Sequence, residues 1–282
     1  MKETDSIRKE GLDKFYTLPA CSKRCIEKVS TMYDITRWDL IVEPSAGNGS
    51  FLNQIPSNKK IGIDISPEHP DIIKQDFFDY HPPPEHKNIL VIGNPPFGRI
   101  SSLAIKFFNH SAKWANAIAF IIPRTFRKTS IQNRLDVRFH LVYDEELPNR
   151  PCCFSPAMAV KCCFQIWEKK DIQRDFVDLP KKHNDWEFLK LGEKDASGQP
   201  TPPANADFAL RAYGSTIGEI KTEGLPYLRP KSWHWIKSNI DKDTLIDRLG
   251  KLDYSKSENT ARQNSMGRAE LVNLYSGYNL DI

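Results

Sequence analysis

The stretch Asn94-Pro95-Pro96-Phe97 has the clearest capacity for chemistry in this chain of 282 residues. It follows the apolar run Ile89-Leu90-Val91, whose composition is typical of a buried strand. Pro95 and Pro96 remove two backbone N–H donors and end that strand. A side-chain amide, free carbonyl groups and an aromatic ring then remain at the tip of the strand. This combination suits a flat group that carries an NH2.

Such an NH2 group is a poor nucleophile, because its lone pair is delocalised into a ring or a carbonyl group. Two hydrogen-bond acceptors on its two N–H bonds would favour a pyramidal nitrogen with an available lone pair. The Asn94 side-chain oxygen and the Pro95 carbonyl are candidates for these acceptors, and Phe97 is a candidate for stacking on the ring. The site would act by positioning and by electrostatic preorganisation. Because Asn-Pro-Pro also occurs in ordinary loops, the motif needs its structural context.

Three acidic residues follow predicted strands upstream of this motif. Glu43 follows the apolar run 40–42, Asp64 ends a predicted strand at 60–65, and Asp76 follows a third strand tip. Ligands gather at the carboxyl ends of parallel strands in open α/β sheets. Asp64 is placed to accept both hydroxyls of a ribose. Asp76 is a candidate acceptor for an adenine amino group, with Phe77 over the ring.

A glycine-rich turn lies between the first two of these strands. Residues 43–51 are predicted to form a strand end, a turn at Gly47 and Gly49, and the start of a helix. Glycines let the backbone approach a ligand closely, and a helix start adds unpaired N–H groups. The pattern matches neither the six-residue dinucleotide motif nor a P-loop. Taken singly, the glycines fit a tight turn, Asp64 a surface residue and Asp76 a helix cap.

Together these motifs resemble those of S-adenosylmethionine-dependent amino-methyltransferases of the N6-adenine type. The order, with the cofactor motif before Asn-Pro-Pro-Phe, is that of the gamma arrangement, and the resemblance covers about residues 12–168. It implies an α/β, Rossmann-like methyltransferase fold with a mostly parallel central sheet. It also implies S-adenosyl-L-methionine as the cofactor and chemistry without a metal.

The resemblance also implies residue roles. The catalytic residues would be Asn94, Pro95, Pro96 and Phe97, and the cofactor-binding residues would be Tyr16, Thr17, Glu43, Pro44, Ala46, Gly47, Gly49, Phe51, Asp64, Ile65, Asp76, Phe77 and Asn94. Two departures from the family pattern stand out. Glu43 occupies a position where the family more often has aspartate. In Phe15-Tyr16-Thr17-Leu18-Pro19, Leu18 is inserted into the Tyr/Phe-Thr-Pro motif, which in the family lies over the methionine part of the cofactor.

A basic segment follows the predicted strand 117–122, at the same end of the sheet as the catalytic motif. The candidate substrate-binding residues in it are Arg124, Thr125, Phe126, Arg127 and Lys128. Three cations and one aromatic ring suit a phosphate and a base. The plainer alternative is a solvated loop with ordinary basic residues. The remaining elements are predicted as helices at 23–33, 101–112 and 129–137 and as two last strands at 139–143 and 160–167, which in this family often form an antiparallel edge.

A polar run after residue 168 predicts a domain boundary. We expect a methyltransferase domain at 1–170 and a small α+β C-terminal extension at 171–282, which either recognises the target or completes the fold. Predicted strands at 186–191, 208–214 and 232–236 and helices at 244–249 and 267–275 surround a loop at 195–206. Tyr213, Trp233 and Trp235 either stack on bases or belong to a core, and their spacing favours a core.

Composition limits the class of protein. Residues 1–170 hold 24 basic against 19 acidic side chains, a net charge of +5, and the remainder holds 16 against 17. A basic catalytic half suits a polyanionic partner. No run of about 18 apolar residues occurs, and the first residues lack the apolar core of a secretory signal. We therefore expect an intracellular protein, cytoplasmic or nuclear, with six reduced cysteines, for which packing is favoured over metal binding.

These observations predict a methyltransferase that acts on the N6 amine of adenine in nucleic acid, with DNA favoured over RNA. Related motifs occur in enzymes that methylate cytosine N4, often with Ser-Pro-Pro-Tyr, and protein glutamine, usually with Asn-Pro-Pro-Tyr. A non-catalytic, nucleic-acid-binding subunit of a methyltransferase complex is a further alternative. Phe97 favours adenine, and the intact motif at 94–97 argues against lost activity.

Overall fold

The computed structural model describes residues 15–278, and the chain divides into two compact units, Met1–Phe176 and Val177–Ile282. The division falls six residues after the boundary expected at 170. The first residues of the chain, on which the absence of a secretory signal was predicted, lie outside the described range. Within that range, no helix combines the length and the apolar character needed to cross a membrane.

The first unit is built on a seven-stranded sheet in the order β4-β3-β2-β5-β6-β9-β7. β2 to β6 are parallel to one another, whereas β9 is antiparallel to both β6 and β7. The predicted Rossmann-like α/β sheet with an antiparallel edge is therefore confirmed. The strands are β2 (Leu40–Pro44), β3 (Lys60–Asp64), β4 (Ile72–Lys74), β5 (Ile89–Gly93), β6 (Ala117–Pro123), β7 (Phe139–Glu146) and β9 (Cys162–Lys169).

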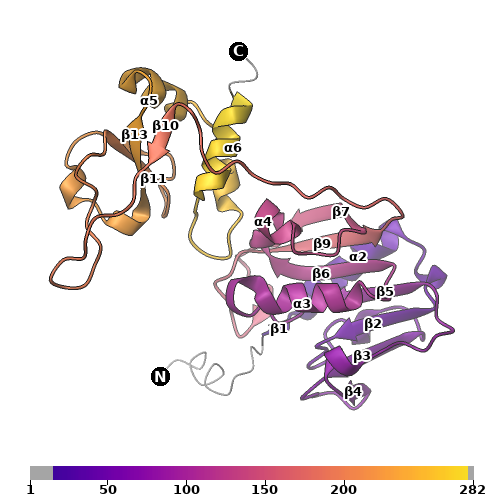
Figure 1. The fold of residues 1–282 in the computed structure, drawn as a ribbon. Helices are drawn as coiled ribbons and strands as arrows, with labels where there is room; N and C mark the ends of the chain where they lie inside the picture. The colour runs from indigo at the N-terminus through magenta and orange to yellow at the C-terminus, as the bar shows by residue number, and fades with distance from the viewer. Residues whose placement is uncertain (1–14, 279–282) are drawn as a thin grey trace. The chain divides into compact units, whose positions relative to one another are not determined.

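Helices cover both faces of this sheet. β2, β5 and β6 are buried along their whole length, as expected for parallel strands covered on both sides. Ile105 and Phe108 of α3 (Ser102–Ser111) pack with Val91 on one face, and α3 lies in front of the sheet in Figure 1. Cys25 and Val29 of α2 (Pro19–Met32) pack with Leu90 on the other. Alternate residues of β5 thus face different helices.

Two predicted helices are shorter than expected. After the glycine turn the chain forms only a 3-10 helix at Leu52–Gln54, because Pro56 lacks an N–H donor and disfavours a helical conformation at the residue before it. α4 spans Thr129–Gln132 and does not reach residue 137. The side chain of Asn109 binds the carbonyl of Arg134 and the N–H of Asp136, and it thereby takes the place of further helix bonds.

A short two-stranded ribbon lies outside the central sheet. β1 (Tyr16–Thr17) pairs antiparallel with β8 (Phe154–Ser155), and the N–H of Leu18 donates to the carbonyl of Cys153 at 2.8 Å. This pairing fixes the N-terminal motif at Tyr16 and Thr17 relative to the rest of the unit. Cys152 and Cys153 directly precede β8. All six cysteines of the chain are free thiols, and all but the half-buried Cys152 are buried.

The second unit is a small α+β arrangement. Its antiparallel sheet has the order β10-β13-β11-β12, with α5 and α6 packed on one face through Leu245, Leu249 and Leu271. The elements are β10 (Trp186–Phe188), β11 (Phe208–Arg211), β12 (Ile220–Lys221), β13 (Trp233–Ser238), α5 (Lys242–Gly250) and α6 (Arg268–Tyr278).

The aromatic residues of β13 belong to this core. Trp235 is 0% exposed and Trp233 is 6% exposed, and both pack with Ala209 on the face opposite α5. For these two tryptophans the base-stacking interpretation is therefore wrong and the favoured assignment to a core is confirmed, whereas Tyr213 is 45% exposed and does not belong to the core. His234 is also buried, with its Nε2 atom 2.8 Å from the Met266 carbonyl, and burial lowers the pKa of its ring to about 4.

Candidate functional site

A cavity of about 360 Å³ lies at the carboxyl ends of β2 to β5, within the range typical of small-molecule sites. It brings together most of the residues that the sequence predicts for a cofactor site. The predicted residues that line it are Tyr16, Thr17, Glu43, Ala46, Gly47, Phe51, Asp64, Ile65, Asp76, Phe77, Asn94 and Pro96.

The carboxylate of Asp64 binds backbone N–H groups in the glycine turn and in the loop after β3. One of its carboxylate oxygens accepts from the N–H of Gly47 at 2.8 Å, and the other accepts from the N–H of Ser66 at 2.7 Å. Gly47 has φ +52°, and a Cβ atom there would lie 3.0 Å from the ring of Tyr16. Only glycine combines this backbone conformation with this close approach. Asp64 therefore shapes the cavity floor as well as lining it.

Glu43 has a structural task beside the cavity. It is 2% exposed, and its Oε2 atom accepts from the N–H of Leu52 at 2.7 Å, at the start of the 3-10 helix that follows the glycine turn. Burial raises the pKa of this carboxyl to about 8, and the N–H groups of Leu52 and Phe51 offset the effect only in part. Glu43 thus braces the turn at 45–52 from inside the protein.

This raised pKa predicts a pH-dependent stability. Between pH 4.5 and 8 the folded protein retains a proton that the unfolded chain has lost. The unfolding free energy should therefore fall as the pH rises, by up to about 1.4 kcal/mol per pH unit from this group. Glu43→Gln keeps an acceptor for Leu52 and removes the titration. Urea unfolding at several pH values should give a smaller pH dependence for the variant, and parallel curves for the two proteins would contradict the assignment.

Asn94 lies immediately after β5 with its two amide atoms in different situations. Its Nδ2 atom donates to the carbonyl of Phe15 at 3.2 Å, whereas its Oδ1 atom is buried. Thr17 Oγ1 is also buried, and neither it nor Asn94 Oδ1 has a hydrogen-bond partner among residues 15–278. Buried polar atoms are rarely left unpaired, so two of them at one cavity indicate positions at which a ligand supplies the partner.

Aromatic rings form one wall of the cavity. Phe77 stacks on Phe107 of α3 at 5.1 Å between ring centroids, and Phe78 meets the same ring edge-on at 5.0 Å. Asp76 orients this wall, because its Oδ1 atom accepts from the N–H of Phe78 at 2.9 Å. The wall leaves an apolar surface beside a carboxylate, which suits a heterocycle with an amino group.

Tyr16 reaches across the glycine turn. Its hydroxyl donates to Oε1 of Glu68 at 2.5 Å, and the N–H of Glu68 donates to the carbonyl of Gly47 at 2.9 Å. Partial burial, together with this carboxylate, raises the pKa of the Tyr16 phenol above its ordinary value of 10. The tyrosine therefore stays protonated and acts as a donor that joins β1 to the loop after β3.

Four of the predicted catalytic and cofactor-binding residues do not line the cavity. Pro44 and Pro95 are buried at strand ends, and Gly49 has φ +80° within the turn. Phe97 is half-buried and packs against the apolar clusters on both faces of the sheet, while its carbonyl accepts from the N–H groups of Leu103 and Ala104. Stacking by Phe97 on a substrate stays a prediction.

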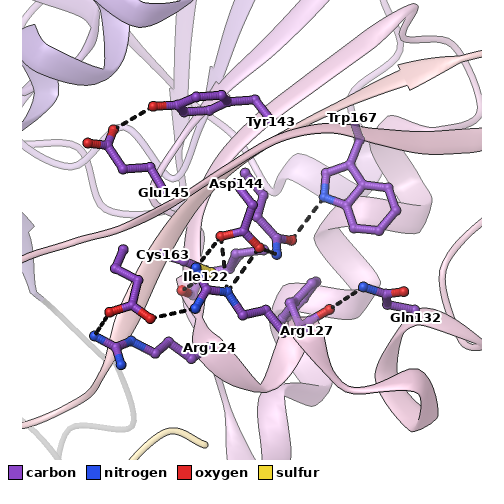
Figure 2. A network of polar contacts seen from close by, with 12 residues as sticks. Ile122, Arg124, Arg127, Gln132, Tyr143, Asp144, Glu145, Cys163 and Trp167 are labelled. Atoms are coloured by element: carbon purple, nitrogen blue, oxygen red, sulfur yellow. Dashed lines mark hydrogen bonds and ion pairs between the residues drawn. The ribbon is translucent and has the colours of Figure 1, made fainter. Parts of the chain in front are cut away.

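The basic segment after β6 is engaged in a polar network (Figure 2). Arg127 donates to both carboxylate oxygens of Asp144 on β7, from Nε at 3.0 Å to each. Glu146 accepts from Arg127 at 2.7 Å and forms an ion pair with Arg124 at 2.7 Å. Gln165 of β9, which is 0% exposed, also donates to Asp144 at 2.7 Å.

This network pairs the two arginines that the sequence predicts to bind substrate, and that role stays a prediction. Their charges are matched by carboxylates of β7, and the neighbouring Asp144 raises the pKa of the Arg127 guanidinium. Phe126 is 0% exposed and belongs to the core. The segment Arg124–Arg127 is thus a 3-10 helix anchored to the sheet, and its position there is structural. Thr125 instead contacts the loop after Phe97, with its Oγ1 atom 2.8 Å from Oγ of Ser101.

Several lining residues were not predicted from the sequence. Phe78 is adjacent to a predicted residue, and Leu103 and Phe107 lie four residues apart on α3, the spacing that places side chains on one helix face. Gln75 follows β4 directly, and Ser66 lies two residues after the end of β3. The helical spacing after Asn94 was the signal that could have identified Leu103 and Phe107.

The charge of the lining restricts the ligand. Among the described residues that line the cavity, Asp64 and Asp76 are acidic and none is Lys, Arg or His, whereas burial raises the pKa of Glu43 to about 8, so this carboxyl carries a proton near neutral pH. Such a lining disfavours a ligand rich in phosphate and suits a neutral or cationic nucleoside. The described residues also contain no group of three or more His, Cys, Asp or Glu side chains placed to hold a metal ion.

Comparison with known proteins finds methyltransferases among the solved structures. The 23S rRNA methyltransferase ErmE is 17% identical over 55% of this chain and 69% of its own, with a TM-score of 0.39. The magnesium protoporphyrin IX methyltransferase ChlM from Synechocystis PCC 6803, solved with bound SAM, is 11% identical over 52% and 79%, with a TM-score of 0.39. The plantazolicin methyltransferase BpumL, solved with SAH, is 14% identical over 54% and 85%, at 0.38.

This chain is similar to these proteins in fold. No protein-family model matches it, and no curated protein is similar to it in sequence.

Proposed function

We propose that this protein is an S-adenosylmethionine-dependent methyltransferase that transfers a methyl group to the N6 amine of adenine in nucleic acid. One observation carries the proposal: Asn94, at the tip of β5, holds a buried and unpaired Oδ1 acceptor at the cavity while its Nδ2 atom is bound to Phe15. An acceptor fixed in this way is what an amine needs if its nitrogen is to attack a methyl group.

The residues of the cavity fit the proposed cofactor. Asp64 lies where a ribose-binding acid is expected, the turn at Gly47 admits close approach, and Phe77 and Phe78 provide an aromatic wall beside Asp76. The unpaired Oγ1 atom of Thr17 is a further polar group for the ligand. The acidic lining suits a sulfonium cation. When bound, S-adenosylmethionine supplies an electrophilic methyl group.

The residues of the chain then act on the amine. Asn94 Oδ1 accepts a hydrogen bond from one N–H group of the amine, and the carbonyl of Pro95 accepts a hydrogen bond from the other. These two bonds orient the nitrogen lone pair and stabilise the positive charge that develops on it. The proton leaves to solvent or to a nearby acceptor. The proposal needs neither a covalent enzyme intermediate nor a metal.

A nucleic-acid substrate is proposed on two grounds. Residues 1–170 have a net charge of +5, which attracts a polyanion. The motif at 94–97 and the N-terminal motif resemble those of enzymes that methylate adenine in DNA, so DNA is proposed ahead of RNA. Because Arg124 and Arg127 are paired with Asp144 and Glu146, the phosphate contacts are expected from other basic residues of the unit.

Asp64→Ala should weaken S-adenosylmethionine binding by about 1–3 kcal/mol, the range for losing hydrogen bonds to a charged group. The variant loses the ribose acceptor and also the bond that holds Gly47. Isothermal titration calorimetry with S-adenosylmethionine measures the effect. Asp71→Ala, on an exposed residue of the same region, is the matched control. An affinity equal to wild type in the Asp64 variant would rule out this assignment.

The substrate class is tested by methyl transfer from S-adenosylmethionine carrying a radioactive methyl group. Purified DNA, RNA and protein pools are incubated separately with the enzyme, and the incorporated label is counted. The proposal predicts incorporation into nucleic acid, with DNA ahead of RNA. Label in protein alone would favour a glutamine or other amide substrate and would contradict the proposal.

A further inference from the structure

The catalytic motif continues directly into a tight turn at the rim of the cavity. The turn spans residues 98–102, between Pro96 and Leu103, both of which line the cavity. Its base is closed by the carbonyl of Phe97, which accepts from the N–H groups of Leu103 and Ala104 at 3.2 and 3.3 Å. A Cβ atom at Gly98 would lie 2.8 Å from Cβ of Leu103, so the turn leaves no room for a larger residue there.

The backbone of this turn is strained. Ile100 has φ +53° and ψ 41°, and Ser101 has φ +58°. Left-handed conformations are uncommon for residues other than glycine, and for a β-branched residue such as isoleucine they are genuine outliers. A strained residue persists only where its surroundings fix it, and such residues cluster at functional sites.

A contact between Ser101 and Thr125 fixes the conformation of the turn. Ser101 is 4% exposed, and its Oγ atom lies 2.8 Å from Oγ1 of Thr125. Thr125 belongs to the 3-10 helix that Arg124 and Arg127 anchor to β7 (Figure 2). The polar network of the sheet edge therefore holds the turn, through Thr125, in a conformation that its own sequence disfavours.

The strained turn exposes the apolar side chain of Ile100 to solvent. Ile100 is 72% exposed, so it contributes little to the core that would offset its strained backbone. Arg99, beside it, is exposed and cationic. A nucleic-acid duplex presents stacked bases between phosphates. The aliphatic side chain of Ile100 suits the bases, and the neighbouring cation suits the phosphates.

We propose that Ile100 is a wedge that enters a nucleic-acid duplex beside the target adenine and fills the space that this base leaves when it is extruded into the cavity. The inference rests on the proposed function and adds to it the residue that takes the place of the extruded base in a duplex substrate. Enzymes that act on a base inside a duplex must take it out of the stack. Apolar side chains inserted between base steps are a known means of opening a stack.

The experiment compares methyl transfer to a duplex and to the corresponding single strand, using oligonucleotides that wild type methylates. Ile100→Ala should lower the ratio of duplex to single-strand activity by about tenfold or more, because only the duplex must be opened. Ile100→Asn should do the same with a relaxed backbone, since asparagine tolerates the left-handed conformation. Ile100→Leu, which keeps the apolar bulk, should restore most of the ratio.

Ile172→Ala is the matched control, because Ile172 is 78% exposed and is not among the residues that line the cavity. A second measurement uses a duplex with 2-aminopurine at the target position, because the fluorescence of this base rises when it is extruded from the stack. The Ile100→Ala variant should give a smaller rise than wild type. If the ratio is unchanged in all Ile100 variants, or if wild type methylates single strands only, the wedge is wrong and the methyltransferase proposal stands. If wild type methylates no nucleic acid, both fail.

Discussion

Asn94→Ala should lower the rate of methyl transfer by about 10²–10³-fold, the usual effect of losing one preorganised hydrogen bond to a developing charge. Cofactor affinity should change little, because the proposed contact of Oδ1 is with the target amine and strengthens in the transition state. The variant also loses the bond from Nδ2 to Phe15, which is partly exposed and long at 3.2 Å, so the fold should survive.

Single-turnover kinetics with saturating cofactor, together with calorimetric cofactor binding, separate the two effects. Asn94→Asp is the sharper comparison. Its carboxylate keeps an acceptor but cannot donate to Phe15 and adds a charge near the sulfonium, so partial activity is expected. A folded Asn94→Ala protein with normal cofactor affinity and wild-type turnover would show that this amide does not act on the amine.

Asp144→Ala should destabilise the first unit by about 2–4 kcal/mol, somewhat below the cost of breaking a fully buried ion pair. The pair that Asp144 forms with Arg127 is about one-fifth exposed on both sides. The substitution leaves that guanidinium without its main partner, and it removes the acceptor of Gln165, which is fully buried. An unpaired buried amide adds its own desolvation cost.

The measurement is urea unfolding of the Asp144 variant against wild type. Asp171→Ala, in an exposed position of the same unit, should change stability by less than about 0.5 kcal/mol. Asp144→Asn, which keeps an acceptor and loses the charge, should fall between the two. Equal stability of Asp144→Ala and Asp171→Ala would mean that the network in Figure 2 contributes nothing to the fold.

The cavity could be predicted from the sequence because its residues follow strands. Apolar runs that end in Glu43, Asp64 and Asn94 identify strand tips, and parallel strands bring their tips to one edge. Each of these three residues lines the cavity. The different roles of these three residues could not be predicted from the sequence. Glu43 turns inward and binds Leu52, since a turn with only a 3-10 helix after it needs an internal brace.

The basic segment at 124–128 shows that a short sequence pattern does not predict contacts with distant residues. Arg124 and Arg127 look like phosphate ligands because the sequence around them holds no acids. Their partners Asp144 and Glu146 are about twenty residues away on β7, and it is the pairing of β9 with both β6 and β7 that brings these groups together. Long-range strand register is not encoded in any short window, and neither is the left-handed backbone at Ile100.

The central claim, that this cavity directs a methyl group to adenine N6, is tested most directly by the mass of the product nucleoside. Nucleic acid is incubated with the protein and with S-adenosylmethionine carrying a trideuterated methyl group, then digested to nucleosides. The account predicts N6-methyladenine nucleosides carrying all three deuterium atoms with wild type, and almost none with Asn94→Ala. Deuterated N4-methylcytosine in their place, or equal N6-methyladenine from both proteins, would contradict it.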